Sequence, residues 1–449
     1  MIRLLVVADD FTGALDTGVQ FAKHDIRTFV TNRLDLGFGD LDDGVEVLVV
    51  NTETRHKGQN HAYEVVYSLA KRAAAFGIGH IYKKTDSVLR GNVGAELLAV
   101  LDAVRAADAV RAADAVRAVD AEARQEGRIM FIPAFPDNHR ITKGGVQLLD
   151  GVPISRTHFA DDPFNPVHES YVPDIIRMQA DVEVTVIATD DAIITGDDSA
   201  QSNGHRGILV FDAATNDDLL RIGSALRPSG GLKLMAGCAG FAGVLHYLLD
   251  FRQQAPELIE FGDSMLLVSG SVNRTSISQM RHAKEYGFKG ASLTPAQKTE
   301  AGYRDSLPGL SFIQHIQSIL TEHKLAYIEA VEDEAGMEEC SRYAAEKGID
   351  ADHQRIAANI GGIVKRVIDG SDMDNLFVFG GDTLLGILEC LAVTGVVPIA
   401  ELCPGVVVSK VVSDVYSFNL ITKAGGLGQE DAVSVAVSLL RMNSSQRDR

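Results

Sequence analysis

The sequence is poor in cysteine and contains no apolar run long enough to cross a membrane. Its four cysteines occur in neither a CxxC motif nor a cysteine–histidine pairing, which argues against a disulfide framework and a structural zinc site. His139 and His158 lack metal-ligand spacing, so we predict no metal-ligand set. The N-terminal stretch MIRLLVVADD reaches acidic residues after eight residues, too early for a signal peptide. We therefore expect a soluble, cytoplasmic protein that binds no membrane.

Basic residues are also fewer than acidic residues. The chain has 61 acidic and 42 basic residues, a formal net charge of −19. Because such a charge repels polyanions, nucleic acid and anionic membranes are unsuitable partners. The net charge does not exclude a small anionic substrate, provided that basic residues gather locally in a cleft.

The chain is long enough for more than one hydrophobic core. Its 449 residues are 46% hydrophobic and 23% charged, an ordinary globular composition. Residues 2–8 are typical of a strand buried on both faces, 13–23 fit a helix, and this alternation restarts after a polar linker. It predicts the α/β class, with two α/β domains whose mainly parallel sheets flank an interdomain cleft. We place the two domains at 1–252 and 263–449.

An alanine-rich repeat interrupts the first domain. VRAADA, VRAADA and VRAVDA follow one another between residues 104 and 121. Alanine with alternating arginine and aspartate favours a helix, but a period of six gives no steady apolar seam. We predict a lengthened surface helix, inserted at about 102–122, with no catalytic role.

Two adjacent acids end the first predicted strand. In VVADDFTGALDTG, Asp9 and Asp10 lie where open parallel sheets bind their ligands, beyond the carboxyl end of a strand. They could accept hydrogen bonds from a polyol, or one could act as a general base. The alternative is that one of them only caps the next helix. Capping would explain one acid but hardly both.

A second polar cluster follows the strand that ends near residue 83. Lys83, Lys84, Asp86, Ser87 and Arg90 lie within YKKTDSVLRGN, and basic groups at a strand end suit a carboxylate or phosphate. The alternative is a solvated turn capped by Asp86 or Ser87. Arg55, after another strand end in NTETRH, would add a guanidinium to the same rim.

A long loop rich in proline and glycine follows, in IPAFPDNHRITKGGVQLLDGVPISRTHFADDPFNPV. Ordered loops of this length are often functional. With Arg140, Thr142, Arg156 and Asp161, it predicts a structured loop over a site.

Three strand-end turns mark the second domain. They are VSGSVNRTS, FVFGGDTLLGIL and TKAGGLGQEDA. One such turn usually reflects tight packing, but three in one domain indicate a polyphosphate cradle built from backbone amides. Neither a GxxxxGK[ST] motif nor a helix-opening GxGxxG occurs, which excludes a P-loop enzyme and weakens a Rossmann dehydrogenase.

These motifs together resemble the four-carbon acid sugar kinase family, long described as a domain of unknown function. The resemblance rests on ADDFTGALDTG, KKTDSVLRGN, PAFPDNHRIT with the loop that follows it, GGDT and KAGGLG, in this order over nearly the whole chain. It implies an N-terminal domain that holds a sugar acid and a C-terminal domain that holds ATP. The phosphate would pass to the terminal hydroxyl of the acid. The DTGVQFAK segment is closer to the threonate and erythronate members than to the oxo-tetronate members.

The resemblance and the strand-end motifs define two sets of candidate residues. The substrate-binding set is Asp9, Asp10, Arg55, Lys84, Thr85, Asp86, Ser87 and Arg90. The ATP-binding set is Ser269, Ser271, Gly380, Gly381, Asp382, Thr383, Lys423, Gly425 and Gly426. We expect ATP and Mg²⁺ as cofactors, with Mg²⁺ bridging the phosphates.

Within these sets, Arg55, Lys84 and Arg90 would fix the substrate carboxylate, and Asp10 or Asp86 would act as the base. One departure from the family pattern is Cys238 in GCAG, where a serine is more usual.

Other functions remain open on the sequence alone. They are an oxo-tetronate kinase of the same family, a nucleotide-sugar or dinucleotide-dependent oxidoreductase with a similar layout, and a sugar-acid sensor without turnover. The preferred epimer is open, and the oligomeric state is not fixed, so a homo-oligomer remains compatible.

Overall fold

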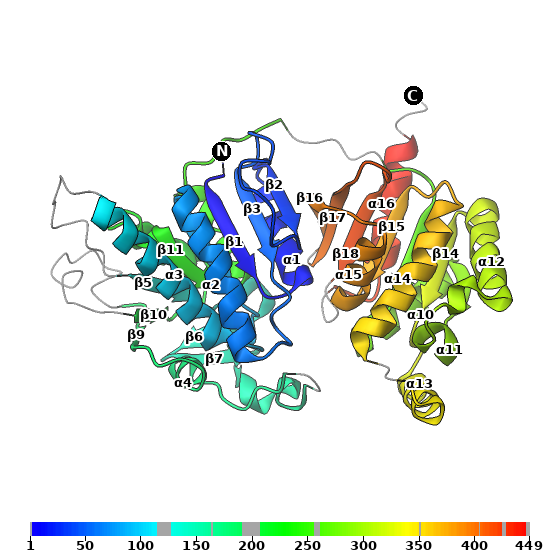
Figure 1. Ribbon diagram of the computed structural model, residues 1–449, viewed down its shortest axis with the longest axis horizontal. Coiled ribbons are helices and arrows are strands. Elements are labelled where there is room, and N and C mark those ends of the chain that lie inside the picture. The colour runs from blue at the N-terminus through cyan, green and yellow to red at the C-terminus, as the bar shows by residue number, and fades with distance from the viewer. Residues whose placement is uncertain are drawn as a thin grey trace. The chain divides into compact units, whose positions relative to one another are not determined.

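The chain folds into two compact units, Met1–Ala255 and Pro256–Arg449 (Figure 1). The structure is a computed structural model that describes residues 2–114, 127–162, 165–190, 207–255, 261–349, 352–403, 405–423 and 428–445. Over these ranges, none of the helices combines the length and apolar character that crossing a bilayer requires. The division lies inside the linker expected from the sequence; the domain bounds 1–252 and 263–449 stay predictions.

The first unit is built on a parallel sheet. Its helices and strands are β1 (Leu4–Ala8), α1 (Phe11–Ala22), β2 (Thr28–Thr31), β3 (Val47–Asn51), α2 (Gln59–Phe76), β4 (His80–Lys84), α3 (Val93–Asp114), β5 (Arg128–Ile132), β6 (Arg140–Lys143), β7 (Val146–Leu149), β8 (Val152–Pro153), α4 (Val172–Arg177), β9 (Val184–Ile187), β10 (Gly207–Phe211), α7 (Asn216–Leu226), β11 (Leu234–Gly237), α8 (Ala239–Ala242) and α9 (Leu245–Leu248). The described strands follow the order β2-β3-β1-β4-β11-β5-β10-β9, and the neighbours pair in parallel. Strands β6, β7 and β8 form a small antiparallel sheet.

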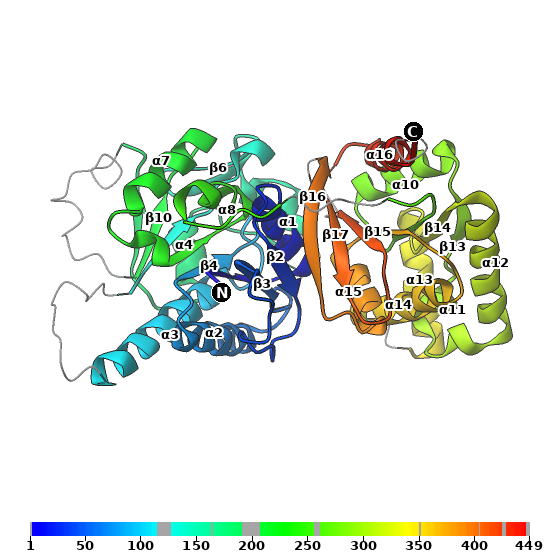
Figure 2. The same cartoon turned by 90° about the horizontal axis from the view of Figure 1, so that it is seen from above.

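Helices cover both faces of the parallel sheet. Figure 2 shows α2 and α3 along one face, with α1, α7 and α8 along the other. All five residues of β1 are buried, as expected for a continuous apolar run in such a sheet. The described part of α3 ends at Asp114, so the first half of the predicted insertion is helical. The rest of it, 115–122, lies outside the described residues.

The second unit has a mixed sheet. Its helices and strands are β12 (Met265–Ser269), α10 (Arg274–Tyr286), β13 (Lys289–Ser292), α11 (Pro295–Thr299), α12 (Leu307–His323), β14 (Leu325–Glu329), α13 (Glu334–Lys347), α14 (His353–Asp369), β15 (Asn375–Phe379), α15 (Gly381–Cys390), β16 (Gly395–Cys403), β17 (Val406–Val412), β18 (Asn419–Lys423) and α16 (Ala432–Ser445). The described strands run β13-β14-β12-β15-β18-β17-β16; those up to β18 pair in parallel, and β17 pairs antiparallel with both neighbours. The expected α/β class with mostly parallel strands is confirmed.

Strand alternation builds one core of the second unit. Every second residue of β12 and β15 packs beneath α10 and α16, including Leu267, Phe377 and Phe379. Met280 of α10 and Val433 of α16 complete this layer. Because the side chains of a strand alternate between the faces of a sheet, the opposite face is left for α14 and α15. The core fixes the strand ends from which the predicted turns depart.

Candidate functional site

Two aspartates follow β1 and share one buried arginine from the segment after β3. Arg55 Nε donates to Asp9 Oδ2 at 2.7 Å, and its Nη1 and Nη2 each donate to an Asp10 carboxylate oxygen at 2.7 Å. Strands β1 and β3 are neighbours, so their carboxyl ends bring these side chains together. The Asp9 side chain is 3% exposed and that of Asp10 24% exposed. Of this pair, Asp10 is therefore the carboxylate that a small ligand can reach.

Asp10 also caps α1. Its Oδ1 accepts the backbone N–H of Gly13 at 3.0 Å. Residue 13 must be glycine, because a Cβ there would collide with Asp10 Oδ1 and lie 2.6 Å from Lys84 Nζ. Asp10 therefore does cap the helix, and its functional role stays a prediction, whereas Asp9 is buried in the ion pair with Arg55.

The buried Asp9 is held ionised by its neighbours. Burial alone would raise its pKa, but the charges of Arg55, Lys83 and Lys84 outweigh burial and hold the pKa of Asp9 below its ordinary value. The pKa of Arg55 is correspondingly raised well above its ordinary range, since the attraction of Asp10, Asp9 and Asp86 exceeds the effect of burial.

The two lysines that end β4 point in different directions. Lys83 Nζ lies 2.8 Å from Glu96 Oε2 and donates to the Val7 carbonyl, entirely buried on the α3 side of the sheet. Lys84 Nζ lies instead beside Gly13, at the start of α1. Among the described residues, Lys84 Nζ has neither a hydrogen-bond partner nor a carboxylate within 4 Å, although only 4% of the Lys84 surface is exposed. The Lys84 ammonium acts on Asp9 and Asp86 only at longer range, where it helps to lower their pKa values.

Asp86 is paired with Arg90. Arg90 Nε and Nη2 donate to the two Asp86 oxygens at 2.9 and 3.0 Å, and its Nη1 reaches Asp162 at 3.1 Å. Arg55 Nη2 lies 3.8 Å from Asp86. Burial would raise the pKa of Asp86, but Arg90 and Arg55 hold it far below its ordinary value. The phenyl ring of Phe159 covers the Arg90 guanidinium at 5.2 Å, so Arg90 ties the long loop to this edge.

Thr85 and Ser87 complete the predicted substrate-binding set. The Thr85 N–H donates to the Gly237 carbonyl at 2.8 Å, while its Oγ1 is buried and has no hydrogen-bond partner in the described ranges. The Ser87 carbonyl accepts from Gln147 Nε2 at 2.9 Å. Gln147 lies on β7, so the loop predicted to cover a site does pack against this segment.

One charged residue beside these groups was predicted only as part of that loop. Arg140 begins β6, and its backbone pairs with Phe135 just after β5. Its Nε atom is buried and has no acceptor among the described residues. Burial lowers the pKa of the Arg140 guanidinium, and the nearby Asp86 carboxylate only partly offsets this effect. The density of proline and glycine around HRIT pointed to a functional loop but not to this side chain.

In the second unit, the turns after β12 and β15 interlock. Ser269 ends β12, and the Gly270 N–H donates to the Phe379 carbonyl at 3.1 Å. A Cβ on Gly270 would overlap Thr383 Oγ1 in the first turn of α15, so only glycine fits. Gly380 is the N-cap of that helix. The two turns thus form a close-packed backbone cradle of the kind that phosphate groups occupy.

Other members of the predicted nucleotide-binding set surround this cradle. Ser271 Oγ accepts the Asn273 N–H at 3.3 Å, and Asp382 is exposed beside Gly381 in the first turn of α15. Gly425 and Gly426 lie outside the described residues. No group of three or more histidine, cysteine or acidic side chains suited to a metal ion occurs in the described part of the chain. Mg²⁺ bound mainly through phosphates needs only one or two carboxylates, a role open to Asp382.

Lys423 ends β18, the strand next to β15. Its Nζ donates to Ser276 Oγ at 3.2 Å and lies 5.0 Å from the centre of the Phe379 ring. Burial lowers the pKa of the Lys423 ammonium to about 7. The parallel order β12-β15-β18 therefore brings the carboxyl ends of these three strands to one edge of the sheet.

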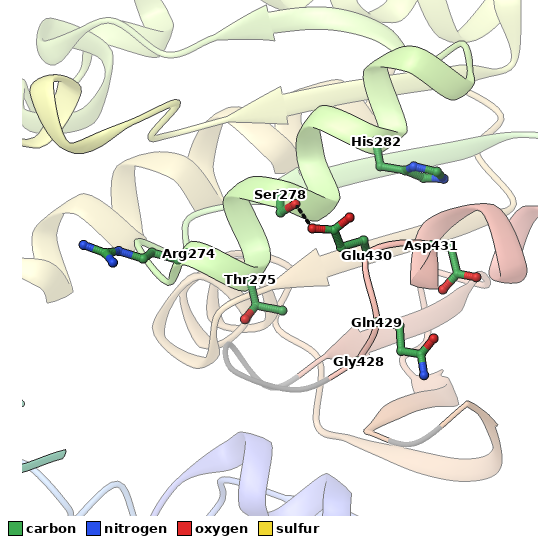
Figure 3. A pocket seen from close by; sticks show the side chains of 8 residues that line it. All are labelled: Arg274, Thr275, Ser278, His282, Gly428, Gln429, Glu430 and Asp431. Atoms are coloured by element: carbon green, nitrogen blue, oxygen red, sulfur yellow. Dashed lines mark hydrogen bonds between the residues drawn. The ribbon is translucent and has the colours of Figure 1, made fainter. Parts of the chain in front are cut away.

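A pocket of about 710 Å³ lies next to Gly428, in the same unit (Figure 3). It is lined by Arg274, Thr275, Ser278, His282, Gly428, Gln429, Glu430 and Asp431. Figure 3 shows Ser278 of α10 and Glu430 of the facing segment pointing toward one another, and their oxygens are 2.7 Å apart. Six of the lining residues belong to two of the predicted turns, Arg274 and Thr275 in VSGSVNRTS and residues 428–431 in TKAGGLGQEDA. Ser278 and His282 were not predicted, because they lie farther along the face of α10, outside both motifs.

Two family models match the chain. One, described as a sugar-binding N-terminal domain, matches residues 4–245, and the other, a nucleotide-binding C-terminal domain, matches residues 266–433.

Three curated relatives show the same likeness. A D-threonate kinase of Salmonella typhimurium is 28% identical, over 97% of this chain and 98% of its own. A D-erythronate kinase of Heliobacterium modesticaldum is 27% identical, over 98% and 97%. A 3-oxo-tetronate kinase of Escherichia coli is 24% identical, over 70% and 76%.

Solved structures share the fold. A Salmonella typhimurium protein superimposes with a TM-score of 0.76 at 21% identity, covering 97% of this chain and 99% of its own. A Haemophilus influenzae protein superimposes with a TM-score of 0.71 at 20% identity, covering 97% and 100%.

Proposed function

Because this chain belongs to the four-carbon acid sugar kinase family, we propose that it uses ATP to phosphorylate the terminal hydroxyl of a four-carbon sugar acid, with D-threonate as the preferred substrate and D-erythronate next. The observation that carries this proposal is the edge of the first sheet. There, the reachable carboxylate of Asp10 and the ammonium of Lys84 both lie beside Gly13, and Lys84 Nζ has no hydrogen-bond partner among the described residues. A molecule with an anionic end and a hydroxyl end suits that pair of charges.

In this proposal the first unit binds and orients the acid. The sequence assigned Arg55 and Arg90 to the substrate carboxylate, but both guanidinium groups already contact two aspartates each. Their geometry supports a role in holding those aspartates in place. The Ser87 hydroxyl is a neutral group of the predicted substrate-binding set that suits a substrate hydroxyl.

Asp10 is the better candidate for the base. Asp86 accepts hydrogen bonds from Nε and Nη2 of Arg90 and from two backbone N–H groups, and its pKa is low because Arg90 and Arg55 outweigh burial. Asp10 is more exposed. It would accept the proton of the terminal hydroxyl as the new oxygen–phosphorus bond forms and the bond to the departing ADP breaks. Since phosphoryl transfer depends mainly on positioning, orienting that hydroxyl is the larger part of this role.

The second unit would hold ATP. The Gly270–Thr383 cradle supplies backbone amides and Lys423 supplies a positive charge, which fits a triphosphate. ATP supplies the phosphoryl group, and Mg²⁺ would neutralise charge on the phosphates. Asp382 would be the protein carboxylate that holds the Mg²⁺ ion. Transfer requires the two ligands to meet, so the proposal includes closure of the predicted interdomain cleft when both are bound.

The pKa of Lys423 predicts how ATP binding depends on pH. Because burial holds this pKa at about 7, the amine is charged below that pH and increasingly neutral above it. Bound phosphates favour the charged form, so binding takes up a proton above pH 7, and we expect the KM for ATP to rise as pH increases from 7 to 9. The Lys423→Met variant should bind ATP about 10- to 100-fold more weakly at pH 6.5 and lose the additional pH dependence.

Steady-state ADP release from pH 6 to 9 checks this expectation. Lys289→Met, at an exposed lysine of β13, is the control and should follow the wild-type profile. A Lys423→Met profile parallel to that of the wild type would remove Lys423 from the nucleotide site.

A substrate panel tests the proposed activity. Purified protein with ATP and Mg²⁺ should release ADP with the highest kcat/KM on D-threonate, followed by D-erythronate, and lower values on L-threonate and the oxo-tetronates. A clear preference for an oxo-tetronate would make it an oxo-tetronate kinase of the same family instead. Binding of an acid without ADP release would indicate a sensor, and no ADP release with any four-carbon acid would contradict the proposal.

A further inference from the structure

The cations at the ligand edge of the first sheet fall into two groups. Arg55 and Arg90 each contact two carboxylates within 3.1 Å. Lys84 and Arg140 contact no carboxylate within 4 Å among the described residues, although Lys84 is 4% exposed and the Nε atom of Arg140 is buried. Because an unpaired charge is costly to bury, a protein that keeps two of them together usually has an anion to bind there.

Arg140 is incompletely hydrogen-bonded. Its Nη1 donates to the carbonyl of Asn138, while its Nε is buried with no acceptor in the described ranges. Buried polar groups without partners are rare and require an explanation. Arg128 has an Nε in the same condition, but it lies at the opposite end of β5, at the start of the strand. Of these two arginines, only Arg140 lies at the ligand edge of the sheet.

Hydrogen bonds hold the β6–β7 hairpin, which begins at Arg140, against the segment that follows β4. Gln147 on β7 donates to the carbonyls of Ser87 and Pro133, joining the hairpin to both strand ends. Asp86 is near enough to Arg140 to offset part of the pKa lowering caused by burial. Lys84 acts on the same carboxylate, since it adds to the effects of Arg90 and Arg55 that overcome burial and lower the pKa of Asp86. Asp86 is therefore a common neighbour of Lys84 and Arg140.

We propose that Lys84 and Arg140 together form the carboxylate subsite for the four-carbon acid, with the buried Thr85 hydroxyl as a third donor. This inference rests on the proposed function and deepens it. The Arg140 fork faces the carboxylate from the β6–β7 hairpin, and Lys84 faces it from β4, so the other end of the substrate is directed toward Asp10. Arg140 is thus a specificity-determining residue: it selects a sugar acid over the neutral alditol of the same length and configuration.

The test compares binding of D-threonate with binding of D-threitol, which lacks the carboxylate. We expect Arg140→Ala to raise the Kd for D-threonate, measured by calorimetry without nucleotide, by about 10- to 100-fold. The KM for ATP and the weak inhibition by D-threitol should stay within about twofold of the wild-type values. Lys84→Met should raise the Kd for D-threonate by a similar factor. Arg140→Lys should bind D-threonate more tightly than Arg140→Ala but more weakly than the wild type. Arg128→Ala is the control, because it removes a guanidinium whose Nε is likewise buried without an acceptor among the described residues. This variant should bind D-threonate as the wild type does.

Three results would overturn the inference. They are an unchanged Kd for D-threonate in Arg140→Ala, an equal loss of acid and alditol binding, and an equal loss in Arg128→Ala. Should Arg140→Ala fail to fold, Lys84→Met and Arg140→Lys decide the outcome by the same comparison. A wild-type protein that binds D-threonate but releases no ADP would contradict the kinase activity and leave this test intact. One that binds no four-carbon acid would overturn both.

Discussion

Asp10→Asn should lower kcat by about 10²- to 10⁴-fold, the usual contribution of a positioned acid or base. The substitution removes the charge that would accept the proton of the substrate hydroxyl. Asparagine keeps an oxygen for the Gly13 N–H and is as good an N-cap as aspartate, so α1 should remain in place. The KM for ATP should change little, because the nucleotide residues lie in the second unit.

A matched control isolates the chemical role of Asp10. Asp352 also caps a helix, and its Oδ1 accepts the Arg355 N–H at 2.7 Å, again three residues ahead. Asp352→Asn should retain the wild-type kcat, which shows that the change from aspartate to asparagine at a helix cap is harmless in itself. Asp86→Asn should affect the KM for the acid and thermal stability more than kcat, since it releases Arg90. Near-normal kcat in Asp10→Asn would remove Asp10 as the base.

Arg55→Ala should destabilise the first unit by about 3–5 kcal/mol at pH 8. The loss is large because Arg55 is buried and serves two carboxylates at once, and its removal leaves Asp9 in the interior without its main partner. Arg33→Ala is the control: it removes a pair with Asp35 at 3.4 Å that is exposed and screened by solvent, so the free energy of unfolding should stay near the wild-type value. Calorimetric unfolding of the full chain, read at the transition of the first unit, checks both variants.

The pH dependence of this loss has a defined sign. In the wild type the pKa of Asp9 is lowered on folding, because the charges around it outweigh burial, so its stabilisation is present at neutral pH and lost under acid conditions. Without Arg55, burial raises the pKa of Asp9, so the folded variant takes up a proton more readily than the unfolded chain. The difference from the wild type should therefore be largest at pH 8 and smaller at pH 5. A constant difference, or one that grows as pH falls, would contradict the assigned ion pair.

The sequence predicted which strand ends carry the polar residues, since apolar runs followed by acids, lysines or glycines mark such ends directly. It could not predict which side chains share the edge of a sheet, because that depends on strand order. The carboxyl ends of β12, β15 and β18 are far apart in the chain and become neighbours only through the order β12-β15-β18.

Individual roles within the clusters were harder to predict. Lys83 and Lys84 look equivalent in YKKTD, yet strand alternation directs one to Glu96 and the other to the start of α1. Arg55 follows a strand end as expected, but no linear pattern reveals that two aspartates occupy its guanidinium. Arg140 was visible only as part of a loop, since its missing partner is a property of the folded interior.

The most direct test of the central claim follows the phosphoryl group itself. Phosphorus-31 NMR of the protein with D-threonate, ATP and Mg²⁺ should show one new phosphomonoester resonance on the acid for each ADP formed, and none without the acid. Formation of ADP with inorganic phosphate and no phosphomonoester, or no consumption of ATP at all, would contradict it.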